Sequence, residues 1–126
     1  MSAIQSTKAF YIQLTEVVNN LVNMFPDDVD LFTLKTFLGM VSKTNPSLII
    51  NKFYDGLTPE YEQFIDTKNE EFFTEYKPVE YGAEGADIFG KVQSYWSVFD
   101  DQTKESIWQY FYILKELCKR AYVKST

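Results

Sequence analysis

Apolar residues recur at spacings of three and four along most of this chain, the spacing that places them on one face of an α-helix. The first such run begins at about Ser6, and Pro26 ends it because proline disfavours a helical conformation in the residue before it. We therefore predict a first helix over about 6–24. Its apolar face consists of Phe10, Leu14, Val17, Leu21 and Met24.

Capping signals divide the next part of the chain into three shorter helices. Asp27-Asp28 places carboxylates at the start of the second helix, where they oppose exposed backbone amides and the helix dipole. Asn45-Pro46 and Thr58-Pro59 each combine an N-cap residue with a first-turn proline, so they predict the starts of a third and a fourth helix. The apolar residues that these helices turn inward are Leu31, Leu34, Leu38, Val41, Ile49, Ile50, Phe53, Leu57, Tyr61, Phe64 and Ile65.

A break in the apolar period follows the fourth helix. Segment 69–76 predicts one further helical turn, from which Phe72 and Phe73 face inward. Residues 77–86 include a proline and two glycines without any apolar repeat, so they predict a loop. The chain shows no clean alternation of apolar and polar residues, and strands are therefore not expected.

Two helices are predicted beyond this loop. Asp87 begins a fifth helix, and Asp100-Asp101 caps the last helix, which covers about 102–123. We therefore expect one all-α domain over 1–126, a compact bundle of five to six helices that is ordered over about 6–123. The residues that we expect to be nearly fully buried are Leu14, Leu21, Leu38, Phe53, Phe111 and Leu114.

The charge of the chain, −6 in total, is concentrated in one segment. From Asp55 to Asp87 there are ten acidic residues and two lysines. The plain interpretation is a solvated acidic face. The alternative is an acidic mimic of nucleic acid that occupies a DNA- or RNA-binding protein. Direct binding of nucleic acid is not expected, because contacts with phosphates require basic patches.

The composition lacks the residues that most catalytic, cofactor and metal sites require. There is no histidine, one cysteine and no glycine-rich phosphate loop, so the sequence predicts no catalytic residue, no cofactor site and no metal site. Asp27-Asp28-x-Asp30 lacks the glycine and the late glutamate of a calcium loop. Cys118 lies on the apolar face of the last helix, where a buried thiol is expected and a reactive thiol is the alternative. We therefore expect a protein that is not an enzyme; a small enzyme or ligand carrier would require a pocket with convergent polar groups.

One side of the last helix carries large residues beyond its apolar face. Trp108 and Tyr112 are four residues apart, and Lys115 and Lys119 continue their line. Either a second packing layer covers them or they form a patch for a protein partner or a second copy of the chain. The patch is our predicted partner-binding site, and the acidic segment 55–87 is a possible complement to its lysines in self-association. The expected function is accordingly a non-enzymatic interaction or structural protein.

Signals for export or membrane insertion are missing from this sequence. No stretch reaches the 18 or more apolar residues of a membrane span. The first residues, Met1 to Ile4, are not followed by the basic and apolar regions of a signal peptide. Together with a single cysteine, these features predict an intracellular, reducing compartment.

The order of caps and aromatic residues resembles that in a group of short uncharacterised proteins encoded by nucleocytoplasmic large DNA viruses, the giant viruses and their relatives. The features, which cover about 8–122, are Phe25-Pro26, Asp28, Asp30, Lys35, Asn45-Pro46, Phe53, Leu57, Pro59, Tyr61, Ile65, Lys68, Glu70, Phe72-Phe73, Trp96, Ile107-Trp108 and Tyr110. The resemblance implies a viral origin and a place in the host cytoplasm, the virus factory or the virion. It implies no activity and no site.

Overall fold

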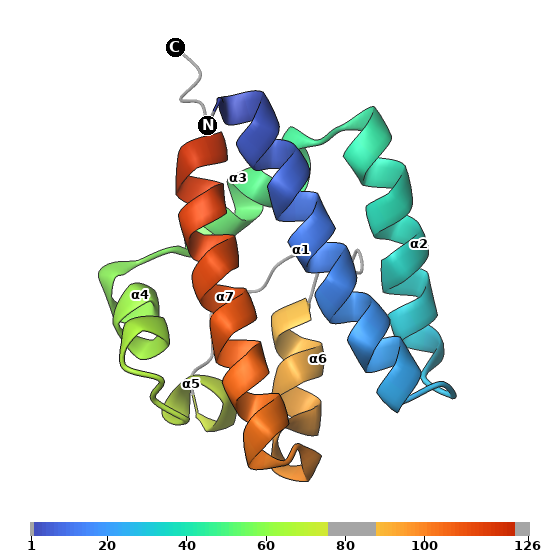
Figure 1. Cartoon of the computed structure of the whole chain (residues 1–126), viewed down its shortest axis with the longest axis vertical. Helices are drawn as coiled ribbons and strands as arrows, with labels where there is room; N and C mark the ends of the chain where they lie inside the picture. Colours follow the sequence, from blue (N-terminus) through green and yellow to red (C-terminus); the bar gives the residue numbers. More distant parts are fainter. Residues whose placement is uncertain (1, 76–87, 123–126) are drawn as a thin grey trace.

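All secondary structure in the residues that the computed structural model describes, 2–75 and 88–122, is helical (Figure 1). In chain order the elements are α1 (Ala3–Met24), α2 (Val29–Thr44), α3 (Ser47–Gly56), α4 (Pro59–Asp66), α5 (Glu71–Thr74), α6 (Ile88–Tyr95), the 3₁₀ turn η1 (Trp96–Val98) and α7 (Asp101–Ala121). The predicted all-α bundle is confirmed, with seven α-helices in these residues where five to six were expected. The excess is α5, a single helical turn. The predicted loop 77–86 and the helix start at Asp87 lie outside the described residues.

The two longest helices, α1 and α7, form the centre of the bundle. They run in opposite directions, and their contact is the most extensive between any two elements (Figure 1). The apolar stripe predicted for α1 is buried, apart from Met24 at its last position, and the buried residues of α7 include Ile107, Phe111, Leu114, Cys118 and Ala121. Mutual burial of two long apolar stripes is the main source of stability for helices of this length.

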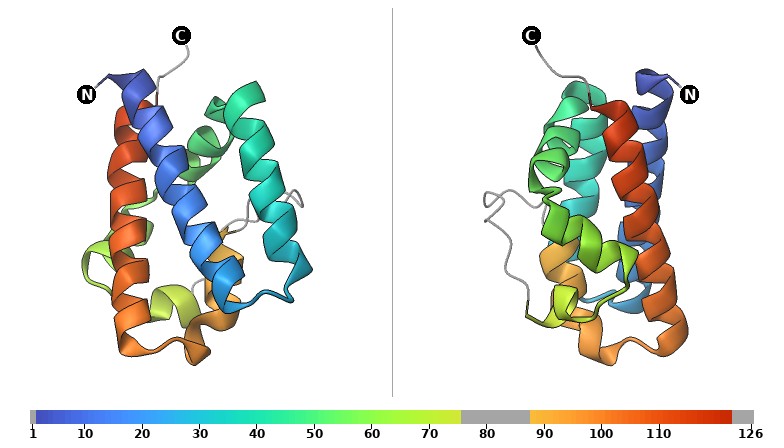
Figure 2. Two further views of the ribbon diagram at one scale, coloured as in Figure 1. Left: turned by 45° about the vertical axis from the view of Figure 1, so that its right-hand side comes forward. Right: turned by 90° about the vertical axis from the view of Figure 1, so that its left-hand side faces the viewer.

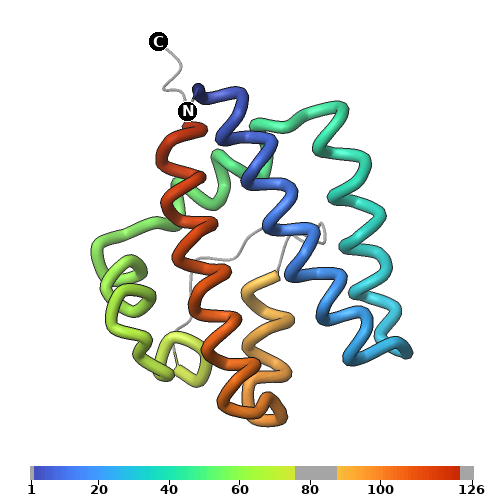
Figure 3. Tube along the Cα trace, viewed as in Figure 1, coloured from blue at the N-terminus to red at the C-terminus, as the bar shows by residue number. Residues whose placement is uncertain are grey.

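The shorter helices cover the two sides of this central pair. Helix α2 packs on α1, whereas α3 and α4 pack on α7. In Figure 2, α3, α4 and α5 follow one another along one side of α7, and α5 also contacts α6. Helices α1 and α2 join at a tight corner and diverge toward the start of α1 (Figure 3). This divergence moves α2 away from the first turns of α1 (Figure 3).

Side-chain caps begin three of the described helices where the sequence predicted them. Asp28, Thr58 and Asp100 each accept a hydrogen bond from a backbone amide two or three residues further on. The predicted cap at Asn45 is wrong, because no side chain caps α3 and Pro46 holds its N-cap position. Helix α3 therefore begins at Ser47, one residue later than expected, although Pro46 already has helical backbone angles.

Helix α1 begins three residues earlier than predicted. Ser2 Oγ accepts a hydrogen bond from the Gln5 amide at 3.1 Å, and Gln5 Oε1 accepts one from the Ser2 amide at 3.0 Å. This reciprocal pair is a capping box, which stabilises the first turn of a helix. As a result, Ile4 belongs to α1 and shares a helix face with residues one and two turns further on.

An aromatic cluster fills the space between α5, α6 and α7. The Phe73 ring lies 4.4 Å from the Trp96 ring and 5.4 Å from the Phe111 ring, centroid to centroid. The Phe72 ring lies 4.7 Å from that of Phe89. The inward orientation predicted for Phe72 and Phe73 is confirmed. The burial predicted for Leu14, Leu21, Leu38, Phe53, Phe111 and Leu114 is confirmed as well.

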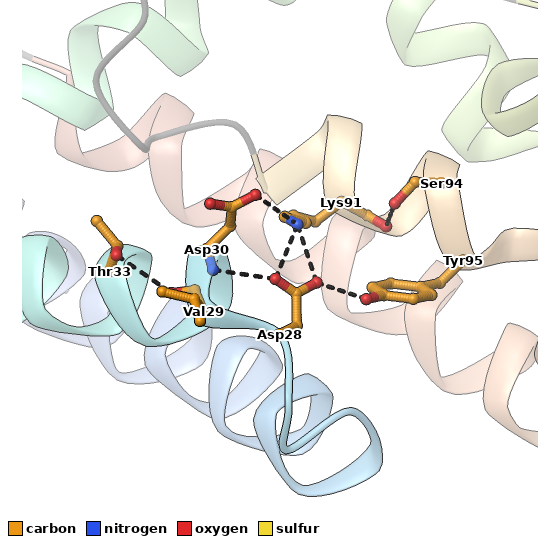
Figure 4. A network of polar contacts seen from close by, with 7 residues as sticks. All are labelled: Asp28, Val29, Asp30, Thr33, Lys91, Ser94 and Tyr95. Atoms are coloured by element: carbon orange, nitrogen blue, oxygen red, sulfur yellow. Dashed lines mark hydrogen bonds and ion pairs between the residues drawn. The ribbon is translucent and has the colours of Figure 1, made fainter.

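A polar cluster fastens the corner between α1 and α2 to α6 (Figure 4). Asp28 accepts hydrogen bonds from the Tyr95 hydroxyl at 2.5 Å and from Lys91 Nζ at 2.9 Å. Lys91 Nζ also lies 3.2 Å from Asp30 Oδ2, and the Phe25 ring stacks on the Tyr95 ring at 3.7 Å. The hydroxyl of Tyr95, and next the ammonium of Lys91, lower the pKa of Asp28 below its usual value. Asp28 therefore joins two distant segments in addition to capping α2.

Candidate functional site

Trp108, the predicted anchor of an exposed patch on the last helix, is buried. Only 5% of its surface is exposed, and its ring lies 4.9 Å from the Phe73 ring and 5.5 Å from the Trp96 ring. The expectation that Trp108 belongs to an open surface is therefore wrong. The physical reason is a second packing layer, because α5 and η1 cover this side of α7.

The two lysines of the predicted patch form ion pairs with α4. Lys115 is 5% exposed, and its Nζ lies 2.6 Å from Asp66 Oδ1. Lys119 pairs with Glu62 in the same way. Both the lysines and the carboxylates are spaced by four residues, so each pair occupies one face of its own helix. Charges that were expected to meet a partner are thus neutralised within the chain.

Two more ion pairs connect the acidic segment to the first half of α7. Lys104 Nζ lies 3.3 Å from Glu70 Oε1, and Lys68 Nζ lies 2.5 Å from Glu105 Oε1. The expectation that this segment complements the lysines of a second copy is corrected accordingly. The complement of the α7 lysines is the acidic segment of the same chain.

Tyr112 is the residue of the predicted set whose ring remains open to solvent, with 47% of its surface exposed. It borders a hollow of about 440 Å³ between α4 and α7. The residues that line this hollow are Ile65, Asp66, Lys68, Glu105, Trp108, Gln109, Tyr112 and Ile113. Its charged groups already pair with one another or with Lys115, so the hollow offers a partner little unpaired charge.

A second hollow, of about 520 Å³, lies where α1 and α2 diverge. We call it the α1–α2 groove, and its lining residues are Ile4, Thr7, Lys8, Tyr11, Ile12, Ser42 and Pro46. The lining residues from α1 follow the three-four spacing of a single helix face. On that face Ile4 is 71% exposed and Ile12 is 64% exposed. Exposed apolar side chains that border a hollow mark a candidate interaction surface.

Tyr11 fixes the wall of this groove. Its hydroxyl donates a hydrogen bond to the Pro46 carbonyl at 2.6 Å and so connects α1 to the start of α3. Burial raises the pKa of Tyr11 to about 12, which keeps the hydroxyl protonated and able to donate at neutral pH. This hydrogen bond holds α1 and the start of α3 together at one side of the groove.

The sequence contained a signal for this groove that we did not use. Ile4 and Ile12 lie off the main apolar stripe of the first helix, as Trp108 and Tyr112 do on the last. Of the two isoleucines, Ile12 lies within the predicted helix 6–24. Its position off the apolar stripe indicates a second candidate surface beside the one on the last helix. It could not have shown which one is covered, because that depends on how the helices pack.

Cys118 takes its expected place in the core. It is fully buried, and its Sγ donates to the Ile50 carbonyl at 3.3 Å. Burial, and next the charge of Asp55, raises the pKa of its thiol to about 12. The expectation of a buried thiol in place of a reactive one is confirmed.

Three further features of the described residues bear on a possible site: a small cavity in the core, the grouping of acidic and cysteine side chains, and the apolar character of the helices. A cavity in the core, lined by residues that include Leu14, Phe53 and Phe89, holds about 20 Å³, room for about one water molecule. No three acidic or cysteine side chains of residues 2–75 and 88–122 gather closely enough to hold a metal ion. None of the helices in these ranges has the length and apolar character needed to cross a membrane.

Comparison with protein families, with curated proteins and with solved structures finds no match to this chain. The resemblance to proteins of large DNA viruses therefore remains a prediction, and a viral setting remains a proposal. The features of this chain that bear on its function are the two hollows and the exposed side chains that border them.

Proposed function

We propose that this chain is a non-enzymatic protein-binding module and that the α1–α2 groove is its binding site. The observation that carries the proposal is the pair Ile4 and Ile12, both open to solvent on one helix face beside a hollow of about 520 Å³. Fully covering one exposed isoleucine stabilises a complex by about 1.5–3 kcal/mol. Two such anchors on a preformed surface are typical of the grooves in which a partner's helix or turn docks.

The distribution of polar groups supports binding more than catalysis. Around the groove, the polar side chains are Thr7, Lys8 and Ser42, together with a tyrosine already hydrogen-bonded to backbone. Enzyme sites need a convergent set of acid, base or nucleophile, and this set offers one cation and two hydroxyls. The groove therefore suits apolar contact with a polar rim, the usual anatomy of a protein interface.

The alternative of an acidic nucleic-acid mimic receives less support from the described residues. Three carboxylates of the acidic segment, those of Glu62, Asp66 and Glu70, each pair with a lysine of α7. A mimic has to present unpaired negative charge at the spacing of phosphates. These pairs reduce the charge available on that face.

Affinity capture with matched variants tests the proposal. We expect the tagged chain to capture a partner from cells of its source organism, and Ile12→Glu to lose that partner because a carboxylate cannot enter an apolar contact. Ile113→Glu is the control, since Ile113 is an exposed isoleucine in the other hollow. Circular dichroism should show both variants folded. Loss of the partner with Ile113→Glu, or its retention with Ile12→Glu, would contradict this choice of site.

A further inference from the structure

The α1–α2 groove has a lysine on or beside each of its two helices, Lys8 on α1 and Lys43 on α2, in an otherwise acidic protein. Segments 2–15 and 35–54 contain four lysines and no acidic residue, although the whole chain has a net charge of −6. None of these lysines, Lys8, Lys35, Lys43 and Lys52, forms an ion pair with another described residue. Lys8 lines the groove, and Lys43 follows its lining residue Ser42. An occupant of this groove should therefore carry negative charge beside its apolar contact.

The corner between α1 and α2, the helix α5 and the turn before α7 lie at the opposite end of the bundle (Figures 1 and 3), and this end is acidic. Segments 23–30, 67–75 and 91–105 contain nine acidic residues and three lysines. All three lysines are already paired within the chain. The acidic residues without an ion pair to another described residue are Asp27, Glu71, Glu75, Asp100 and Asp101.

An apolar projection lies at this acidic end. Val98, in the turn η1, is 66% exposed, whereas Trp96 and Phe99 on either side of it are buried. Asp100 and Asp101 follow directly, and both are exposed. The buried neighbours anchor the turn, so Val98 and the two carboxylates form a fixed corner. We call these three residues the η1 corner.

We propose that the α1–α2 groove receives the η1 corner of a second copy of this chain. In this arrangement Val98 packs against Ile4 and Ile12, and the carboxylates of the corner face the lysines around the groove. The inference rests on the proposed function, because it names the partner of the same groove. It adds that the partner is the chain itself, joined head to tail.

Electrostatics favours this orientation over others. Two copies of an acidic chain repel each other in most arrangements. End-to-end contact instead places Lys8 and Lys43 at the groove of one copy against the unpaired carboxylates of the next. Complementary charge of this kind sets orientation and speeds association, while the apolar contact supplies most of the affinity. Because two different surfaces meet, repeated addition produces open chains or closed rings.

Sedimentation velocity measures the first consequence. At low ionic strength, the average mass should rise with protein concentration above the 14.8 kDa of one chain. At about 1 M salt, where screening acts over about 3 Å, the mass at the same protein concentration should be lower, because the charge contribution is screened while the apolar contact remains. A wild-type chain that remains monomeric at low salt and high concentration would overturn head-to-tail assembly.

Two blocking variants test the geometry. Ile12→Glu blocks the groove and keeps the corner, whereas Val98→Lys blocks the corner and keeps the groove. Each variant alone should be monomeric, yet an equimolar mixture should form a dimer of about twice the monomer mass and nothing larger. This is expected because the one intact groove and the one intact corner can still meet. Ile113→Glu, on the other hollow, should assemble as the wild type does.

The outcomes separate this inference from the proposed function. If the wild type is monomeric but Ile12→Glu loses a captured partner, the groove binds another protein; head-to-tail assembly is then overturned and the proposed function stands. If the wild type assembles and Ile12→Glu assembles equally well, both the groove and the head-to-tail contact are rejected. If both single variants are monomeric and their mixture forms no dimer, the contact is not the one between Ile12 and Val98.

Discussion

The ammonium of Lys115 lies 2.6 Å from the carboxylate of Asp66, although Lys115 is buried in α7 and Asp66 is at the exposed end of α4. The Lys115 ammonium also lies 4.7 Å from the centre of the Tyr112 ring, within the range of a cation–π contact. A buried ammonium is tolerated only when such partners replace its lost hydration. The last helix is thus attached to α4 by charge as well as by apolar contact.

Replacing Asp66 with alanine should destabilise the protein. The change leaves a buried ammonium without its carboxylate, and a hydrogen bond to a charged group contributes about 1.5–3 kcal/mol. We expect the free energy of unfolding, measured by urea denaturation, to fall by about that amount. Adding Lys115→Met to the same chain should recover most of the loss, because the charge that lacked a partner is then removed.

The ion pair between Lys119 of α7 and Glu62 of α4 provides the comparison. Lys119 lies closer to solvent, and exposed pairs contribute about 0–1 kcal/mol. Lys119→Met should therefore change the free energy of unfolding by less than about 1 kcal/mol. Equal effects of Asp66→Ala and Lys119→Met would mean that the burial of Lys115 has no energetic consequence.

Acid should weaken the corner between α1 and α2 through Asp28. The folded protein holds the pKa of Asp28 below its usual value, first through Tyr95 and then through Lys91. A carboxyl with a depressed folded-state pKa stabilises the fold above its unfolded-state pKa, about 3.9, and this contribution is lost as pH falls through the folded-state value. We expect Asp28→Asn to lower the free energy of unfolding at pH 7 and to have little effect near pH 2.

Asparagine is the informative replacement, because it remains a good N-cap residue for α2. Any loss at neutral pH then reports on the contacts with α6 rather than on the cap. Asp27→Asn is the control, since Asp27 forms no ion pair with the described residues. Parallel pH profiles for wild type and Asp28→Asn, measured by denaturation from pH 2 to pH 7, would reject the role of Asp28.

Local signals in the sequence predicted most of the secondary structure correctly. Thr58 and Asp100 cap the helices they were expected to cap, because an N-cap hydrogen bond closes within three residues and depends on little else. The three-four spacing also identified buried positions such as Leu14 and Phe111. These features follow from neighbours in sequence, which the sequence displays directly.

The candidate site could not be predicted in the same way. Trp108 and Ile12 both lie off the apolar stripe of their helix, yet the first is buried and the second is exposed. The difference arises because α5 and η1 pack over one side of α7, whereas α2 diverges from the first half of α1. The spacing of apolar residues predicts which face of a helix a residue occupies. Which other helix covers that face depends on long-range packing, which the spacing does not predict.

Replacing Trp108 with alanine should destabilise the fold. The ring contacts Phe73 and Trp96 in the core, and removing a buried tryptophan costs about 3–5 kcal/mol. Tyr112→Ala, one turn further along α7, should cost far less because that ring is half exposed. Chemical denaturation of both variants makes the comparison. A loss below about 1 kcal/mol for Trp108→Ala would restore the surface interpretation.

Cys118 should react with a thiol reagent only when the bundle opens. Its pKa of about 12 leaves a thiolate fraction on the order of 10⁻⁴ at pH 8, and the thiolate is the reacting species. Burial adds a steric barrier, so labelling by a pyridyl disulfide should be slow in native conditions and should accelerate with denaturant in step with unfolding.

The control is Ser106→Cys in a Cys118→Ala background, because Ser106 is an exposed position on the same helix and its thiol should react at once. Immediate, stoichiometric labelling of the native wild type would show that α7 leaves the bundle far more readily than its burial against α1 and α3 implies.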